Sequence, residues 1–374
     1  MRYYQSMEKF IIQGGKPLQG IIEVRGAKNA ATPILAACLL TKRACIIDNL
    51  PLIKDVFKML EILESMGVEI NWLGKRKIKV EAKTIDPSKM NHDLVCQLRS
   101  SILLIGPCLA RFGEIKIPHP GGCIIGARPL GIHLDALASL GVEVKQDKDF
   151  YLLTAKRELP AKNKEIVLKE FSVTATENLM MASALTPAKT RIKIAAAEPH
   201  VQDLAKFLSK LGVKIEGSGT HTLIIKGRRK LSGANHTLIP DSIEAGTFII
   251  IGAATRGKVV VKNIISEHLD LVLEKLKEMN VSFTLKENPS TQLQNICLKP
   301  SAMLKSTKIE ARVYPGIPTD LQPLFAVLAT QAEGTSLIHD TLFEGRLKYI
   351  DELSKMGANA VLCDPHRALI TGPT

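Results

Sequence analysis

One stretch of the sequence carries residues whose types and spacing suit a reactive thiol. The segment 119–133 places a single cysteine, Cys123, among three glycines and five residues ahead of Arg128. Glycine permits left-handed backbone conformations, so a tight loop is predicted, and Pro129 suits the first turn of a helix that runs through Leu140. An arginine and the positive end of a helix lower the pKa of a thiol, as a reactive cysteine requires. The alternative is a tight turn that holds a buried and inert thiol.

Further candidates are cations where helices are expected to begin. Lys28 and Asn29 open one such helix, and Arg99 opens another that is otherwise apolar. A cation gains nothing from the dipole at a helix N-terminus, so a bound phosphate explains it better than the helix itself does. The planar guanidinium of Arg128 suits a phosphate or a carboxylate. Each of these residues could instead simply open a helix or be a solvated charge.

Two acidic residues, Asp241 and Glu244, stand at the start of a further predicted helix. Acidic side chains cap helices and favour the dipole at that end without any catalytic role. Capping and catalysis therefore stay equally open for this pair.

Composition narrows the class of protein. The 374 residues are 45% hydrophobic, which allows two or three domains with their own cores. A net charge of +13 favours anionic ligands, while only 4% aromatic residues give little support to nucleic-acid binding. The seven cysteines form no C-x-x-C pair and no metal-ligand spacing with histidine, so neither a disulfide framework nor a zinc site is indicated. No metal or organic cofactor is implied by the chain as a whole. We expect a cytoplasmic protein, because neither a signal peptide nor a membrane-spanning segment is recognisable.

The elements that must position these residues repeat along the chain with a period near 70 residues. A phrase that closes a helix and opens a strand occurs five times. Each copy carries glycine or asparagine where a left-handed helix cap is expected. The copies are LESMGVEI at 63–70, LASLGVEV at 137–144, LSKLGVKI at 208–215, LKEMNVSF at 276–283 and LSKMGANA at 353–360.

Upstream of each phrase the sequence predicts an apolar helix and a short β-branched strand. One unit is therefore a helix, a strand, a helix and two strands, with a preceding strand shared from elsewhere. We expect an α/β protein with a first domain of three units at 21–229. The second domain, 1–20 plus 230–374, would hold two units and an added strand at Lys9–Gln13. The polar segment 229–237 is expected to cross between the domains.

The repeats and several motifs together resemble the enolpyruvyl transferases, and the branch acting on a UDP-sugar more than the shikimate-3-phosphate branch, which would carry Gly-Ser-Lys-Ser. The resemblance covers nearly the whole chain. Its motifs are LQGxIxVxGAKNAAxPIL at 18–35, RSSI at 99–102, PGGCIIGARP at 120–129, PDSIEAGTF at 240–248, PTDLQ at 318–322 and FEGR at 343–346. It implies two similar domains of βαβαββ units in an inside-out α/β prism, with the second domain incomplete because a sixth unit is lacking.

The resemblance also implies an activity and a site. Enolpyruvyl would pass from phosphoenolpyruvate to the 3-hydroxyl of UDP-N-acetylglucosamine, with release of phosphate, as the first committed step of peptidoglycan synthesis. Catalytic roles fall on Cys123, Asp320, Lys28 and Arg128, with Cys123 also the thiol that the epoxide fosfomycin alkylates. Substrate contacts fall on Lys28, Asn29, Arg99, Arg128, Pro129, Leu130, Gly131, Ile132, Ser172, Val173, Asp320, Leu342 and Arg346. Lys54 matches a position near the active site.

The sequence departs from the family pattern at three positions. Glu170 stands where lysine is frequent, Thr174 where glycine is usual and His200 where glutamate is usual. An incomplete second domain leaves a second hypothesis, a catalytically silent homologue that binds a UDP-sugar as a regulatory or interaction module. A third is nonspecific binding of anions or nucleic acid through the net charge. We expect small-molecule substrates, no nucleic-acid or membrane partner, and a monomer or a weak homo-oligomer.

Overall fold

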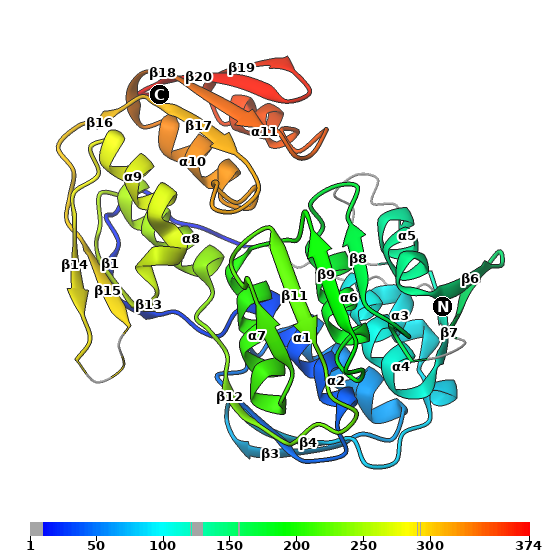
Figure 1. Ribbon diagram of the computed structural model, residues 1–374. Helices are drawn as coiled ribbons and strands as arrows, with labels where there is room; N and C mark the ends of the chain where they lie inside the picture. The colour runs from blue at the N-terminus through cyan, green and yellow to red at the C-terminus, as the bar shows by residue number, and fades with distance from the viewer. Residues whose placement is uncertain (1–9, 120, 122–129, 156–157, 290, 292) are drawn as a thin grey trace, which may run out of the picture.

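A computed structural model describes residues 10–119, 121, 130–155, 158–289, 291 and 293–374. Two α/β domains lie beside one another, one running from blue to green and the other from yellow to red in Figure 1. Each has its own hydrophobic core. The first core draws its buried residues from Ala27 to Leu238, and the second from Val24 and from Ala245 to Ile370.

The first domain has three separate sheets on the described residues. The first sheet has the order β12 (Asn235–Thr237), β2 (Cys45–Asp48), β4 (Lys77–Glu81) and β3 (Glu69–Gly74). The second is β5 (Glu114–Pro118), β7 (Phe150–Ala155) and β6 (Val142–Gln146). The third is β10 (Lys214–Glu216), β11 (Thr222–Lys226), β9 (Lys189–Lys193) and β8 (Lys164–Val167).

The helices of the first domain fall into an inner and an outer set. The inner α1 (Lys28–Ala37), α4 (Ile105–Phe112) and α6 (Val173–Ala182) are apolar, and α6 is buried from Ala175 to its end. The outer ones are α2 (Lys54–Ser65), α3 (His92–Gln97), α5 (Gly131–Leu140) and α7 (Pro199–Leu211). Short 3₁₀ turns are η1 (Cys38–Leu40), η2 (Pro87–Lys89) and η3 (Arg99–Leu104).

The second domain has two described sheets. One has the order β1 (Gln19–Glu23), β13 (Lys258–Ile264), β15 (Gln294–Leu298) and β14 (Phe283–Glu287). The other is β16 (Leu304–Lys305), β18 (Ala332–Asp340), β20 (Arg367–Gly372) and β19 (Asn359–Asp364), with β17 (Lys308–Ala311) also on β18. Its helices are α8 (Ser242–Ala254), α9 (Asp270–Glu278), α10 (Gln322–Ala329) and α11 (Tyr349–Lys355), with the turn η4 (Ser266–Leu269).

The predicted unit is confirmed in all five copies. In each, an inner helix leads to a strand, an outer helix and an antiparallel pair, as in α1, β2, α2, β3 and β4. In four sheets the first strand of the unit also has a parallel neighbour from elsewhere in the chain, such as β12 beside β2 and β1 beside β13. The sheets stay separate, and the described residues form no closed barrel.

The recurring phrase has the local geometry expected of it. Gly67, Gly141, Gly212 and Gly357 have φ of 94°, 116°, 109° and 97°, and Asn280 has φ of 62°. All five residues are therefore left-handed, the conformation that ends a helix and turns the chain into the next strand. Because this signal is local, the five caps follow directly from the sequence.

Two strand pairings bear on where the chain crosses between the domains. Residues 21–23, expected in the first domain, belong to β1 and pair with β13 of the second. Residues 235–237, expected in the second domain, pair with β2 of the first. The pairing partners are more than 180 residues away, so no local signal marks them. We propose that the division falls at residues 24–27 and 238–245.

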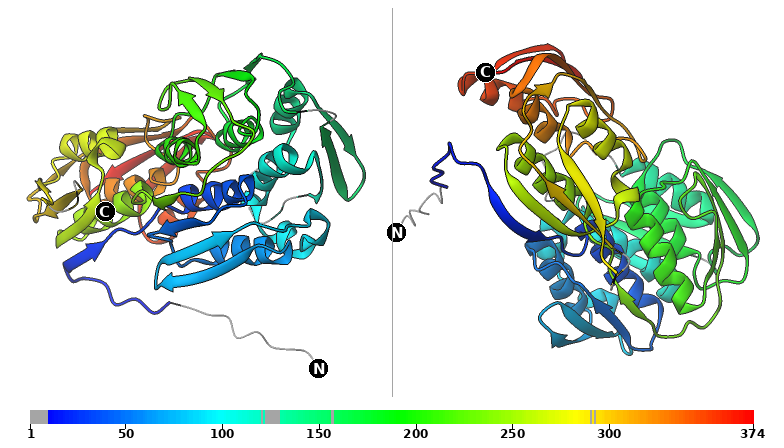
Figure 2. Two further views of the ribbon diagram at one scale, coloured as in Figure 1. Left: turned by 60° about the horizontal axis from the view of Figure 1, so that its bottom comes forward. Right: turned by 90° about the vertical axis from the view of Figure 1, so that its left-hand side faces the viewer.

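The strand predicted at Lys9–Gln13 is not formed over its described residues. Phe10, Ile11 and Ile12 have no strand pairing and are 97%, 82% and 85% exposed. In Figure 2 this part of the chain runs away from the body of the protein. A strand needs a neighbour for its backbone hydrogen bonds, and an apolar run alone does not supply one.

Candidate active site

The approach to the cysteine segment is held by backbone packing. His119 lies edge-on to the ring of Tyr151 with centroids 4.5 Å apart. A Cβ added at Gly121 would lie 1.9 Å from the carbonyl oxygen of Cys96, so only glycine fits there. Cys123, Arg128 and Pro129 themselves lie outside the described residues, and their roles stay predictions.

A first group of predicted site residues gathers where α1 and α2 begin. Lys28 and Asn29 are the first two residues of α1, and Lys54 is the first of α2. The Nζ atom of Lys28 is 3.5 Å from a carboxylate oxygen of Asp55, which ties the two helix starts together. Such an exposed ion pair contributes little to folding stability. A phosphate can therefore replace Asp55 as the partner of the lysine. The N-cap residues of both helices are apolar and form no side-chain cap, and Asp241 accepts the N–H of Lys28. A helix start without a side-chain cap suits an anion.

A second group links η3, α5 and α6. Arg99 begins η3, Leu130 is the N-cap of α5, and Gly131 and Ile132 are its first residues. Ser172 is the N-cap of α6, where its hydroxyl oxygen accepts from the N–H of Ala175. The predicted nucleotide-binding residues Leu130, Gly131, Ile132, Ser172 and Val173 thus lie at the starts of two helices that pack on each other.

His133 and Thr174 join this group, although neither was a candidate in the sequence. The Nε2 atom of His133 and the hydroxyl of Thr174 are 2.6 Å apart, which connects α5 to α6. Burial, and then the positive charge of Arg99, lower the pKa of His133 to about 4. The histidine is therefore neutral at pH 7. No motif marks it, since its partner lies 41 residues away.

The low pKa of His133 predicts acid sensitivity. Its unfolded-state value is near 6.5, so the unfolded chain binds more protons than the folded one as pH falls from 6.5 toward 4. Between pH 7 and pH 5 this residue should cost about 2 kcal/mol of folding free energy. Urea unfolding of the wild type and of His133→Gln at both pH values measures it, because other groups contribute equally to both chains. Equal pH dependence in the two chains would contradict the prediction.

A third group lies in the second domain. Asp320 and Arg346 form an ion pair, with Nη2 and Oδ1 2.5 Å apart. The carboxylate is about half exposed, whereas the arginine side chain is only 15% exposed. Asp320 lies in a turn, two residues before α10 begins. Leu342 stands four residues before Arg346 in the sequence, and its side chain is partly exposed.

A buried aspartate, Asp340, holds the two segments of this third group together. It is fully buried at the end of β18. One oxygen accepts the hydroxyl proton of Thr319, and the other accepts the N–H groups of Leu342 and Phe343 at 2.9 and 3.0 Å. Asp340 therefore fixes the chain on both sides of the Asp320 and Arg346 pair. The sequence could suggest it only as a polar residue ending an apolar strand.

The three departures from the family pattern have different structural settings. Glu170 is exposed just before α6, and Thr174 contacts His133 as described above. His200 lies in the first turn of α7, where burial lowers its pKa to about 4. The hydroxyl of Thr174 thus makes a contact with His133 that a glycine at this position could not make.

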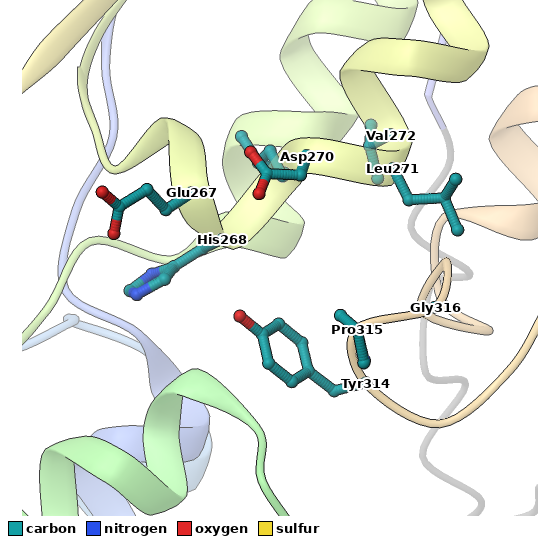
Figure 3. A pocket seen from close by; sticks show the side chains of 9 residues that line it. Glu267, His268, Asp270, Leu271, Val272, Tyr314, Pro315 and Gly316 are labelled. Atoms are coloured by element: carbon teal, nitrogen blue, oxygen red, sulfur yellow. The ribbon is translucent and has the colours of Figure 1, made fainter. Parts of the chain in front are cut away.

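The predicted site residues do not line the hollow between Glu267–Val272 and Tyr314–Gly316. Its volume is about 210 Å³ with open solvent included. In Figure 3 the hydroxyl end of Tyr314 points toward His268. The hollow is smaller than a usual ligand site and lies within the second domain.

In the described ranges, no group of three His, Cys, Asp or Glu could hold a metal ion. No described helix is long and apolar enough to cross a membrane. The six described cysteines are all free.

Comparison with known proteins gives the family. The profile of the family described as EPSP synthase (3-phosphoshikimate 1-carboxyvinyltransferase) matches residues 12–371. UDP-N-acetylglucosamine 1-carboxyvinyltransferase of Hydrogenovibrio crunogenus is 41% identical over 94% of this chain and 82% of its own length. The protein of the same name from Treponema denticola is 40% identical, over 98% of this chain and 86% of its own length. The chain belongs to the UDP-N-acetylglucosamine 1-carboxyvinyltransferase group of the enolpyruvyl transferases.

Solved structures of this family show the same fold. The enolpyruvyl transferase NikO from Streptomyces tendae superposes with a TM-score of 0.82 at 23% identity, over 97% of this chain and 84% of that one. An EPSP synthase from Acinetobacter baumannii gives a TM-score of 0.70 at 19% identity, over 97% and 84%. The two-domain α/β architecture expected from the repeats is thereby confirmed.

Proposed function

We propose that this transferase moves the enolpyruvyl group of phosphoenolpyruvate to the 3-hydroxyl of UDP-N-acetylglucosamine and releases inorganic phosphate. The observation that carries the proposal is about 40% identity to proteins named for this activity across nearly the whole chain. The shikimate-phosphate alternative has weaker support, because two solved EPSP synthases that superpose on the chain are each only 19% identical to it. The chain would act in the cytoplasm, at the first committed step of peptidoglycan synthesis, as a monomer or a weak homo-oligomer.

The proposed chemistry is an addition followed by an elimination. The sugar 3-hydroxyl loses its proton while its oxygen bonds to C2 of phosphoenolpyruvate, and C3 gains a proton. C3 then loses a proton, the double bond re-forms, and the bond between C2 and the phosphate oxygen breaks. A positioned base and acid serve both steps, and for these roles we propose Asp320 and Cys123.

Three features of the described residues support this assignment. Lys28, Asn29 and Lys54 gather cationic and N–H groups at two helix starts, a suitable place for the phosphate of phosphoenolpyruvate. The second group, around Arg99 and Ser172, offers the first-domain surface for the UDP-sugar. Asp320 sits in the other domain with its carboxylate partly exposed. Closure of the two domains over the substrates would bring these groups to the reacting atoms.

A phosphate-release assay with both substrates tests the proposal. We expect phosphate only when phosphoenolpyruvate and UDP-N-acetylglucosamine are both present, and loss of release after preincubation with fosfomycin. Cys123→Ser should resist fosfomycin labelling, detected as the absence of added mass on the protein. Cys363→Ser is the matched control, since Cys363 is an exposed cysteine in β19 of the second domain.

The outcomes separate the competing functions. Calorimetric binding of the UDP-sugar without any phosphate release would favour the silent binding module. Release with shikimate 3-phosphate in place of the UDP-sugar would favour the other branch of the family. Salt-sensitive DNA binding that is indifferent to Cys123→Ser would favour nonspecific binding through the charge.

A further inference from the structure

The two chain crossings between the domains lie side by side and are joined by hydrogen bonds. Gly26 and Pro240 form an isolated antiparallel bridge. On the first-domain side, the N–H of Ala27 donates to the carbonyl of Ile239 at 2.8 Å. On the second-domain side, the N–H of Asp241 donates to the carbonyl of Arg25 at 2.8 Å. Any rotation of one domain against the other must pass through this short ladder.

The first-domain end of the ladder is anchored in its core. Asp203 of α7 accepts the N–H of Ile239 at 3.3 Å with one oxygen, and its other oxygen is 3.1 Å from Nε2 of His236. A Cβ added at Gly26 would lie 1.9 Å from the carbonyl oxygen of Asn49, so the other crossing strand also presses on the first domain. The crossings are therefore held to the first domain by these contacts as far as Ile239 and Gly26.

The second-domain end begins with Asp241, which does two things at once. Its Oδ1 atom accepts the N–H groups of Ile243 and Glu244, at 2.9 and 3.1 Å, and so caps α8. Its Oδ2 atom accepts the N–H of Lys28 at 3.2 Å, the first residue of α1 in the other domain. Both helix starts favour a negative charge.

We propose that Asp241 is a positioning residue for the transfer reaction, because it links the start of α8 to the start of α1 and thereby sets the position of Lys28. Lys28 is the first residue of α1, so its N–H has no acceptor within the helix, and Asp241 supplies one. A movement of α8 on domain closure is transmitted through one carboxylate to the residue that we assign to phosphate binding. Asp241 itself touches no reacting atom in this scheme.

Glu244 supports the same link from the next turn. Its Oε2 atom accepts the N–H of Arg25 at 2.9 Å, on the strand that leads into α1. Both acidic residues of the PDSIEAGTF motif thus contact the crossing strand, and neither is only a helix cap. The sequence left open whether Asp241 caps a helix or has a functional role. In the structure it caps α8, and we propose the positioning role in addition.

Asp241→Asn separates the two contacts. Asparagine caps helices as well as aspartate does, but its side chain has one acceptor oxygen in place of two. With that oxygen on α8, the amide group cannot accept the Lys28 N–H. We expect faster amide hydrogen exchange at Lys28 with unchanged protection at Ile243 and Glu244, and an unchanged urea midpoint.

The kinetic expectation rests on the proposed function. In Asp241→Asn, kcat/KM for phosphoenolpyruvate should fall about tenfold, while KM for UDP-N-acetylglucosamine changes less than twofold. A purely structural defect lowers the active fraction and leaves both KM values alone. Asp241→Ala loses the cap as well, so it should show both the kinetic change and a lower urea midpoint. Asn91→Ala is the matched control, because Asn91 caps α3 through Leu94 at 3.1 Å away from the crossings.

The results distinguish failure of this inference from failure of the proposed function. Unchanged exchange at Lys28, or an unchanged kcat/KM for phosphoenolpyruvate, in Asp241→Asn overturns the positioning role. If the wild type releases no phosphate, the proposed function fails, and calorimetric affinity for phosphoenolpyruvate replaces kcat/KM as the readout. A tenfold loss of that affinity together with faster Lys28 exchange then still supports the link.

Discussion

Asp320→Asn is expected to lower kcat for phosphate release by about a hundredfold to ten-thousandfold, the usual range for loss of a general base. Asparagine keeps the shape of the side chain but cannot take a proton from the sugar hydroxyl. Binding of UDP-N-acetylglucosamine, measured by calorimetry, should change little, because most of the residues assigned to this substrate lie in the first domain and asparagine keeps a polar side chain at position 320. Single-turnover phosphate release measures the chemical step directly.

The control variant for Asp320 must remove another carboxylate of the same domain and keep Asp320 itself. Asp351→Asn in the first turn of α11 serves, since Asp351 is exposed. Arg346→Lys tests the other member of the ion pair, because lysine keeps the charge but not the planar guanidinium. A normal turnover rate in Asp320→Asn would remove the assigned base from the mechanism.

Lys28→Met is expected to lower kcat/KM for phosphoenolpyruvate by roughly tenfold to a hundredfold, the range for loss of a hydrogen bond to a charged group. Methionine keeps most of the side-chain volume and helix propensity but has no charge, so the start of α1 can still form. The measurement is initial phosphate release over a range of phosphoenolpyruvate concentrations. Urea unfolding should show unchanged stability, because the lysine loses only an exposed ion pair.

Two further variants locate the effect of Lys28. Lys89→Met removes an equal charge from an exposed position in η2 and should leave kinetics unchanged. Asp55→Asn removes the carboxylate that lies 3.5 Å from Nζ of Lys28. This variant should leave kcat/KM for phosphoenolpyruvate equal to that of the wild type or slightly higher. Wild-type kinetics in Lys28→Met would place the phosphate elsewhere.

Local features of the structure could be predicted from the sequence alone. The five left-handed caps follow from glycine or asparagine at the end of each repeated phrase, because backbone conformation there depends on one residue. The strands after each inner helix also lie where their β-branched runs predict, as at Cys45–Asp48 and Lys258–Ile264. The motifs likewise identified Lys28, Asp320 and Arg346 as candidates.

Only the tertiary structure could decide contacts between distant segments. The strand expected at Lys9–Gln13 is not formed at its described residues, whereas the residues just after it pair with β13. The contacts of Asp340 with Thr319, of His133 with Thr174 and of Asp241 with Lys28 join residues 21, 41 and 213 positions apart. Propensity and periodicity describe neighbours along the chain, while these contacts depend on how whole units pack. The sequence alone therefore determined the repeating unit and the kinds of residue that we propose for the chemistry, whereas the fold decided which side chains contact the described ones.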